Sequence, residues 1–207
     1  MGAIGDVFLD IGAVLGLLVA AYTAYEMLQR PKIELYPANS ISLPVSRKGY
    51  ISKFQLGCNL ANKTSKLGAV QRLEIEVINP KHEVYRFRWK LFYEYQPETG
   101  EILKESDPYP IIVMPKNSQV LFIEFESADS IPSEEWIIGR YEFNVKGWMN
   151  RKDRNSKVNL KSSFHINITE EIHSKLMMEQ TVGPPRDGTL SFYRPSFCPI
   201  PIEEWDF

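Results

Sequence analysis

The stretch that most constrains this chain is Ile11 to Leu28, IGAVLGLLVAAYTAYEML, an apolar run with no charged residue before Glu26. A helix rises about 1.5 Å per residue, so a helix over this run would be roughly 27 Å long, close to the hydrocarbon thickness of a bilayer. In lipid, a single segment satisfies its backbone polar groups only as a helix. The run therefore predicts an N-terminal transmembrane anchor helix over residues 1–30.

A cleaved signal peptide is the alternative interpretation of this run. It would require a basic segment before the run, but the first ten residues contain Asp6 and Asp10 and no lysine or arginine. Basic residues instead follow the run, beginning with Arg30 and Lys32, and basic flanks remain on the cytoplasmic side. We therefore expect an integral, single-pass membrane protein with its N-terminus outside and the following domain in the cytoplasm.

Small residues recur every four positions in the same run, and positions four apart lie on one face of a helix. They would form a ridge: Gly12, Gly16, Ala20 and Ala24. Small side chains allow two helix backbones to approach closely in a membrane. We expect the ridge to pack against a helix of a second copy or of another transmembrane subunit, with membrane lipid around it. A ridge that faces lipid is the alternative.

The remaining residues have the composition of a folded domain. The whole chain is 43% hydrophobic and 12% aromatic, which suits a packed core and argues against disorder. Its net charge of −2 gives no indication of a nucleic-acid partner. The two cysteines, Cys58 and Cys198, are too few for a disulfide framework or a structural zinc site. We expect one domain over residues 31–168 and a tail over residues 169–207.

Short stretches that alternate apolar and polar residues follow one another through residues 31–168, with turn-forming residues between them. The strongest lies at residues 85–95, where every second residue is aromatic or aliphatic. If residues 72–77 pair with this stretch, glutamates and arginines face each other on its solvent side. Strands at this spacing, without helices between them, predict an all-β, antiparallel β-sandwich.

The segment Gly139-x-Tyr141-x-Phe143-x-Val145 resembles the late strand of immunoglobulin-like and fibronectin III-like β-sandwiches. In those folds a tyrosine near the start of that strand bonds back to the preceding corner. The resemblance implies this position for Tyr141 and a core position for Trp89. The cysteine pair of antibody domains is missing, so the resemblance concerns the fold and implies no activity.

The tail begins with Thr169 as the N-cap of a short helix, which Gly183-Pro-Pro185 ends. The residues that follow are rich in proline and aromatic side chains, which predicts an extended segment that docks on a surface. That surface is either a sheet edge of the same chain or a partner subunit. The aromatic anchors for partner docking would be Phe192, Tyr193, Phe197, Trp205 and Phe207.

A loop at residues 150–157 contains the densest basic patch of the chain. Its basic residues are Arg151, Lys152, Arg154 and Lys157. Such a loop is either a solvated hairpin tip or a contact for anionic lipid headgroups or a partner. The helix anchor would keep it within reach of a membrane surface.

The sequence contains no residue pattern typical of an enzyme or a metal site. The three histidines, His82, His165 and His173, lack the spacing of a zinc-binding helix, and no cysteine has a histidine beside it. A phosphate-binding glycine loop and a nucleophile-elbow motif are also missing. We expect no catalytic residue, no metal and no cofactor; a site assembled from distant residues is the alternative.

Together these features predict a membrane-anchored β-sandwich that acts as an interaction or scaffold module, an accessory subunit of a larger membrane protein complex. The alternative is a membrane-tethered sensor whose sandwich binds a small molecule or a lipid and signals through the helix. A deep apolar pocket between the sheets would favour the sensor. Solidly packed sheets would favour the interaction module.

Overall fold

The structure is a computed structural model that describes residues 2–28, 30–44, 53–95, 102–127, 136–149, 158–177 and 197–206. Side chains are described in these ranges except at residues 2–13, 27, 94–95, 102–105, 197 and 204–206. The elements, in chain order, are α1 (Gly2–Leu28), β1 (Ile33–Pro44), β2 (Lys53–Asn62), β3 (Gly68–Val70), β4 (Arg72–Ile78), β5 (Val84–Tyr95), β6 (Ile102–Ser106), β7 (Ile111–Val113), β8 (Ser118–Ser127), β9 (Gly139–Trp148), β10 (Leu160–Ile168), α2 (Glu170–Leu176) and β11 (Phe197–Asp206).

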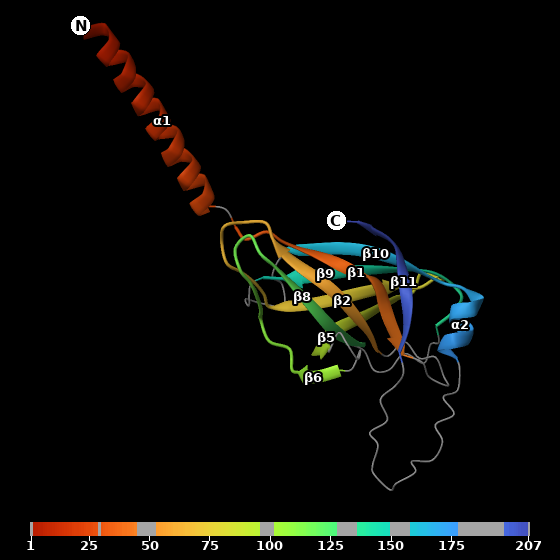
Figure 1. The fold of residues 1–207 in the computed structure, drawn as a ribbon. Coiled ribbons are helices and arrows are strands. Elements are labelled where there is room, and N and C mark those ends of the chain that lie inside the picture. Colours follow the sequence, from red (N-terminus) through yellow and green to blue (C-terminus); the bar gives the residue numbers. More distant parts are fainter. Residues whose placement is uncertain are drawn as a thin grey trace.

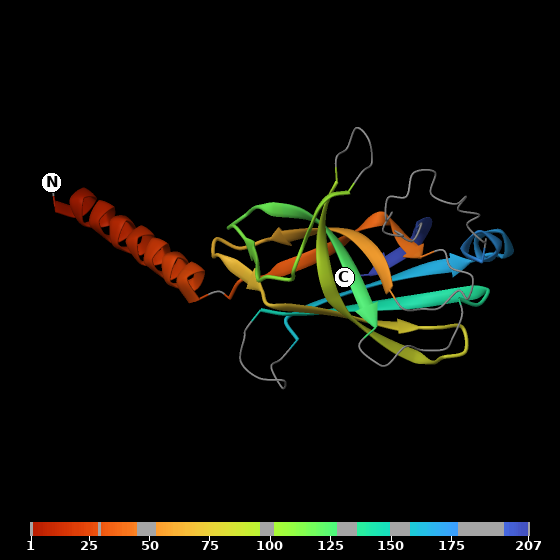
Figure 2. The ribbon, with the colours of Figure 1, turned by 90° about the horizontal axis from the view of Figure 1, so that it is seen from below.

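Within the described residues, eight strands form one closed, barrel-like antiparallel sheet in the order β4-β9-β10-β11-β1-β2-β8-β5 (Figure 1). The pairing of β4 with β5 completes the ring (Figure 2). β6 pairs with the C-terminal part of β5, from Phe92 to Tyr95. β3 pairs with β7 in a separate small sheet. The prediction of an all-β, antiparallel fold is confirmed. The two-sheet immunoglobulin-like or fibronectin III-like sandwich is not confirmed, because the strands close into one ring.

The extended part of the tail forms β11, which lies between β1 and β10. Its first half pairs with β1, from Phe197 opposite Pro44 to Pro201 opposite Ser40, and its second half pairs with β10 from Ile202 onward. Proline has no backbone N–H to donate. The two prolines of β11, Pro199 and Pro201, lie in the half that pairs with β1. The pairing with β10, which begins at Ile202, therefore loses no backbone donor.

The inward faces of the strands fill the ring with aromatic and aliphatic side chains. The Phe54 ring centroid lies 4.9 Å from that of Phe87 and 5.4 Å from those of Phe125 and Phe143. All four side chains are fully buried. Burial of one such aromatic side chain contributes about 1.5–3 kcal/mol, so this cluster stabilises the ring from inside.

The alternation of β5 changes at a bulge between Trp89 and Leu91. Phe87 faces the interior before the bulge and Phe92 faces it afterwards. An extra residue turns the side chains that follow to the opposite face. Tyr93 therefore lies on the outer face, where the sequence pattern predicted another inward residue. Trp89 is half-buried and packs against the core.

Tyr141 lies near the start of β9 and is fully buried. Its hydroxyl accepts a hydrogen bond from the backbone N–H of Ile137 at 2.8 Å, and its ring centroid lies 5.2 Å from that of Trp136. This hydrogen bond is the link back to the preceding corner that the resemblance implied. It fixes the segment that enters β9.

α2 lies at the end of the ring opposite α1 (Figure 1). Thr169 is its N-cap, as predicted: the Thr169 hydroxyl accepts a hydrogen bond from the backbone N–H of Ile172 at 3.3 Å. Leu176 on the same helix is fully buried and belongs to the core. α2 therefore covers one end of the ring.

α1 projects from the body, and its described side chains begin at Val14 (Figure 1). Among the described residues, no helix combines the length and the apolarity needed to cross a membrane. The predictions of a single-pass transmembrane helix, an integral membrane location and an outside-to-cytoplasm orientation are therefore wrong.

The Ile200→Ala variant tests whether β11 is part of the ring core. Ile200 is fully buried and pairs with Ile41 of β1, so the truncation should lower the free energy of unfolding by about 2–5 kcal/mol. Urea denaturation of the full chain measures the loss. Glu203→Ala, an exposed change in the same strand, should stay within about 0.5 kcal/mol. Equal stability of the two variants would contradict the placement of β11.

Candidate functional site

The outer surface of β5, β4, β9 and β10 carries most of its charged side chains in two rows. We call this surface the polar face. In the first row, the backbone register aligns Arg88, Glu74, Lys146 and Lys161 across the four strands. In the second row, it aligns Arg86, Glu76, Asn144 and Ser163. The opposite charges that the sequence predicted across β4 and β5 do face each other.

Each of the two central glutamates contacts two cations. Glu74 Oε1 lies 3.4 Å from Arg72 Nε and 3.5 Å from Arg88 Nε. Glu76 lies 3.5 Å from Arg86 Nε and 2.5 Å from the Lys146 ammonium. One carboxylate neutralises one cation, so both clusters keep a positive charge.

Arg72 also covers the one described indole on this face. Its guanidinium carbon lies 3.8 Å from the ring centroid of Trp148, and Trp148 is only 7% exposed. A guanidinium stacked on an indole gains about 0.5–2 kcal/mol. This contact fixes one end of the polar face where β4 meets β9.

Two depressions of about 330 Å³ and about 310 Å³ adjoin on the polar face. The first, which we call the lysine cavity, is lined by Glu76, Asn144, Val145, Lys146, Lys161, Ser162 and Ser163. The second, which we call the histidine cavity, is lined by Ile78, Asn79, Pro80, His82, Arg140, Glu142 and His165. The register places Ser163 and His165 two residues apart on β10, so the two cavities are neighbours on this face.

The histidine cavity contains a polar atom without a partner. His165 lies on the outer face of β10, and its Nδ1 is buried without a hydrogen-bond partner. His82 stands in the β4–β5 turn with a positive φ of 65°. Asn79 shapes that turn, because its side-chain oxygen accepts hydrogen bonds from the backbone N–H groups of Lys81 and Glu83, both at 2.9 Å.

A second polar cluster lies on the outer face of β2, β8 and β5. Glu124 is 5% exposed there, accepts a short hydrogen bond from the Tyr93 hydroxyl and lies 3.5 Å from the Lys53 ammonium. A cavity of about 190 Å³ next to it is lined by Phe92, Tyr93, Ser106, Tyr109, Gln119, Val120, Leu121 and Phe122. The ion pair compensates the burial of the Glu124 carboxylate.

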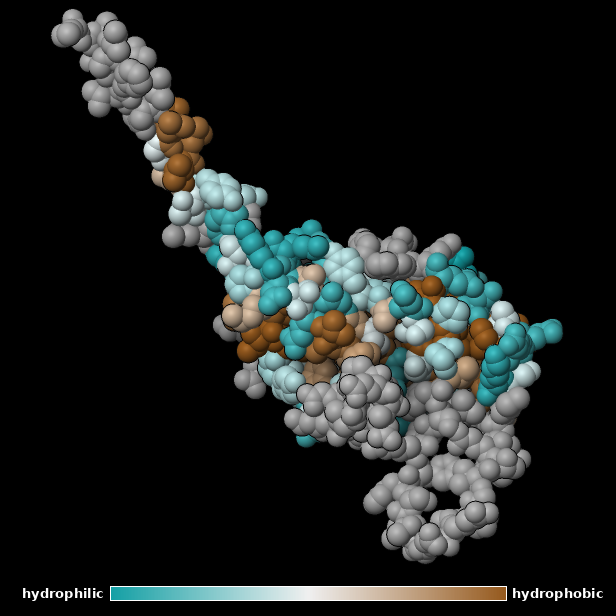
Figure 3. Space-filling model, in the orientation of Figure 1, coloured by the Kyte–Doolittle hydropathy of each residue, from teal (hydrophilic) through white to brown (hydrophobic). Residues whose placement is uncertain are grey.

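From Gly16 to Ala24, the predicted helix ridge lies on a surface of α1 that the other described residues leave open. Ala20 and Ala24 are exposed, and a Cβ built on Gly16 would meet nothing within 4 Å. Gly12 belongs to α1, but its surroundings lie outside the described part. Large apolar side chains cover the other faces of the helix: Val14, Leu15, Leu17, Leu18, Val19, Tyr22, Tyr25 and Leu28 are exposed (Figure 3).

The base of α1 is joined to the body by polar and apolar contacts. Ser65 donates a hydrogen bond to the Glu26 carboxylate at 2.5 Å. A Cβ added to Gly68 would come within 2.6 Å of Ile33 and 3.4 Å of Pro31. The link between α1 and β1 therefore packs closely against Gly68 at the start of β3.

Several predicted contact residues fall outside the description. Arg151, Lys152, Arg154 and Lys157, and likewise Phe192, Tyr193 and Phe207, lie outside the described residues. Phe197 and Trp205 belong to β11, where their backbones pair with Pro44 and Phe164. The contributions of β9 and β10 to the polar face were not predicted. Alternating polar residues in Arg140–Lys146 were the available signal, but the pairing partner of β9 was unknown.

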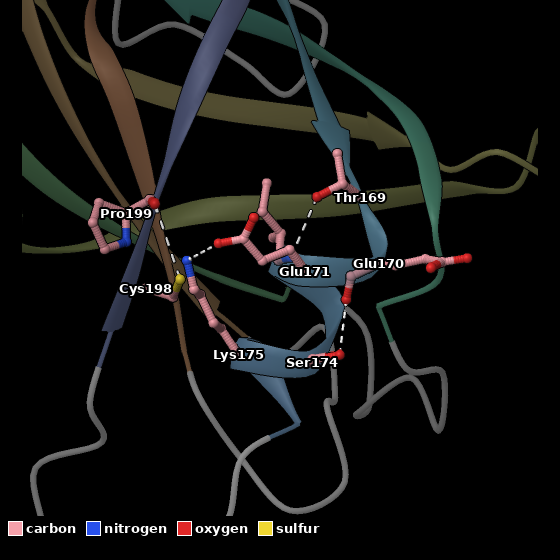
Figure 4. A network of polar contacts seen from close by, with 8 residues as sticks. Thr169, Glu170, Glu171, Ser174, Lys175, Cys198 and Pro199 are labelled. Carbon is pink, nitrogen blue, oxygen red and sulfur yellow. Dashed lines mark hydrogen bonds and ion pairs between the residues drawn. The ribbon is translucent and has the colours of Figure 1, made fainter.

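No group of metal-binding side chains occurs among the described residues. Both cysteines are free thiols. Burial raises the pKa of the Cys58 thiol to about 12. Burial also raises the pKa of Cys198, and the nearby Lys175 ammonium opposes that shift. Figure 4 shows Cys198 beside Lys175, whose ammonium pairs with Glu171 at 2.6 Å.

No protein-family model matches the chain, and no curated protein matches it. Among solved structures, β-glucosidase 3B from Thermotoga neapolitana is 19% identical with a TM-score of 0.31 over 67% of this chain and 16% of that chain. The β-glucosidase from Kluyveromyces marxianus is 12% identical, with a TM-score of 0.31 over 68% of this chain and 15% of that chain. The CARDB domain of the PF1109 protein from Pyrococcus furiosus, in complex with di-metal ions, is 13% identical with a TM-score of 0.26, over 67% and 91%.

The chain thus spans about a sixth of the length of the β-glucosidases that it resembles. Likeness at these TM-scores supports no conclusion about a shared fold or activity. The functional argument therefore rests on the surfaces of this chain.

The two thiols should differ strongly in reactivity. At pH 8, a thiol with a pKa of about 12 is ionised in roughly one molecule in ten thousand, and the thiolate is the nucleophile. A disulfide reagent such as DTNB should therefore modify the half-buried Cys198 first and Cys58 only on unfolding. Cys198→Ser should remove the early reaction. Equal rates for both thiols in the native chain would refute the burial of Cys58.

The same shift makes stability depend on pH. The folded pKa of Cys58 lies above its usual value of 9.0, so the protonated thiol stabilises the folded chain fully below pH 9. This contribution is lost as the pH rises toward 12.

Proposed function

We propose that this protein is an interaction module that assembles with another protein through α1. The observation that carries the proposal is the exposure of large apolar side chains around a helix that projects from the body (Figure 3). Leu17 and Leu28, for example, are 72% and 82% exposed. Surfaces of this kind mark interaction sites, because a helix that is apolar on all sides is stable when something covers it.

The free energy available for such an interaction is large. Full burial of a leucine or valine side chain contributes about 1.5–3 kcal/mol. The exposed apolar residues of α1 extend from Val14 to Leu28, over four turns. A partner that covers a part of them would gain enough to offset the cost of association.

The small-residue ridge is the side of α1 best suited to a second helix. Gly16 has open space around it, and Ala20 and Ala24 continue the same face. Small side chains bring two helix axes close together, so that their backbones and flanking side chains make dispersion contacts. The partner in this proposal is therefore a helix, from a second copy or from another protein.

The closed sheet supports a scaffold role. Its interior is filled by the phenylalanine cluster around Phe54, and the Glu26–Ser65 hydrogen bond and the Gly68 contact join α1 to it. A ligand sensor would require an apolar cavity inside the body. The three cavities described above open instead on the outer faces of the body. These observations support the interaction module over the sensor.

The Gly16→Leu variant tests the proposal. Apart from the backbone of α1 itself, nothing in the described part of the chain lies within 4 Å of the new Cβ. Leucine favours a helix by about 1 kcal/mol over glycine, so the chain should fold as before. It should nevertheless lower the association constant at least tenfold, or about 1.4 kcal/mol, because the leucine prevents close helix contact. Light scattering after size exclusion, with mass spectrometry of co-purified proteins, measures assembly.

Leu18→Ala is the matched control, because Leu18 lies on the face opposite the ridge. It should reduce association much less than Gly16→Leu does. A wild-type chain that remains a monomer without partners would refute the proposal. Equal assembly of the wild-type and Gly16→Leu chains would refute the role of the ridge.

A further inference from the structure

We infer that the polar face is a second docking surface, for an acidic peptide segment of a partner protein. It is separate from α1, so this inference stands apart from the proposed function. Across the polar face, cations outnumber carboxylates two to one, although the whole chain has a net charge of −2. Lys90 of β5 is not counted, because it pairs with Glu126 of β8 at 3.1 Å. The other described cations are Arg72, Arg86, Arg88, Arg140, Lys146 and Lys161, and the described carboxylates are Glu74, Glu76 and Glu142.

The exposed arginines are arranged to bind further carboxylates. Arg86 and Arg88 are each 67% exposed and contact their glutamates through Nε. Their exposure leaves both guanidinium groups accessible to a second partner. Planar guanidinium groups bind carboxylates through two parallel hydrogen bonds.

Lys161 contributes a charge that the described part of the chain does not neutralise. It is exposed, lines the lysine cavity and has no ion pair with any described residue. In the first row it lies beside Lys146, and Arg88 lies beyond Glu74 on the other side. This row therefore contains three cations and one carboxylate, Glu74, while Lys146 pairs with Glu76 of the second row.

The spacing of these charges fits a peptide better than a small anion. Neighbouring strands are about 4.8 Å apart, so the row from Arg88 to Lys161 extends over about 14 Å. A single carboxylate reaches one or two of its cations. An extended acidic segment places alternate side chains about 7 Å apart. Its side chains can therefore reach Arg88, the lysine cavity and the neighbouring histidine cavity at the same time.

The polar face is poorly suited to single-stranded nucleic acid. Proteins that bind single strands use exposed aromatic rings on which bases stack. On the described polar face, the indole of Trp148 is 7% exposed beneath Arg72, so it offers no such platform. Glu74 and Glu76 also interrupt the positive stripe that a phosphate backbone would follow. The charge pattern therefore favours an acidic peptide.

A fluorescein-labelled hexaglutamate peptide tests the inference, by anisotropy with the full-length chain. Hexaglutamate should bind at low ionic strength and weaken as salt shortens the Debye length, and labelled hexaglutamine should not bind. The Arg88→Gln/Lys161→Gln double variant should bind hexaglutamate about five- to tenfold more weakly, because each surface pair is worth up to about 1 kcal/mol.

The Lys32→Gln/Lys116→Gln variant removes the same charge at the α1 end of the body and should stay within about twofold of wild type. Lys161→Gln alone disturbs no ion pair of the described chain, so it serves as the test if the double variant fails to fold, and it should weaken binding about two- to threefold. The inference is overturned by no binding of hexaglutamate, by equal affinities of the two double variants, or by tighter binding of a thymidine dodecanucleotide.

Discussion

The backbone pairing of β4 with β5 is the constraint on which the rest of the structure depends. It joins the two ends of the strand order and turns an open sheet into a ring. An open sheet of this length would leave two edges with unpaired N–H and C=O groups, which recruit other strands. Closure removes those edges and also encloses the phenylalanine cluster around Phe54. Hydrogen bonding and apolar burial therefore support the same arrangement.

Closure also positions both candidate interaction surfaces. Because β4 pairs with β5 on one side and β9 on the other, Glu74 and Glu76 lie between cations from both neighbours, and the polar face becomes a continuous surface. α1 lies outside the ring, and the link from α1 to β1 packs against Gly68. The body thus carries an apolar helix at one end and a charged surface along its side, which supports the view of the protein as a scaffold.

Local features of the fold could be predicted from the sequence, whereas its closure could not. Alternation placed Leu73, Ile75 and Val77 in the core, and all three are fully buried. Thr169 as an N-cap and Tyr141 as a corner residue also follow from local chemistry. The pairing of β11 with β1 joins residues more than a hundred positions apart, and the bulge in β5 depends on its pairing with β8. Neither feature leaves a local pattern in the sequence. The apolar run at the front predicted a helix correctly and a membrane span wrongly, because no helix among the described residues is both long enough and apolar enough to cross a membrane.

Amide hydrogen exchange of the full-length chain, read by mass spectrometry, tests the closed ring most directly. If β11 is a ring strand, peptides from residues 197–206 should be protected as strongly as those from β1 and β10, because their amides exchange through the same global opening. The β4 and β5 segments should share that protection. Rapid exchange of residues 197–206 or of β4, while the other strands stay protected, would contradict the closed sheet.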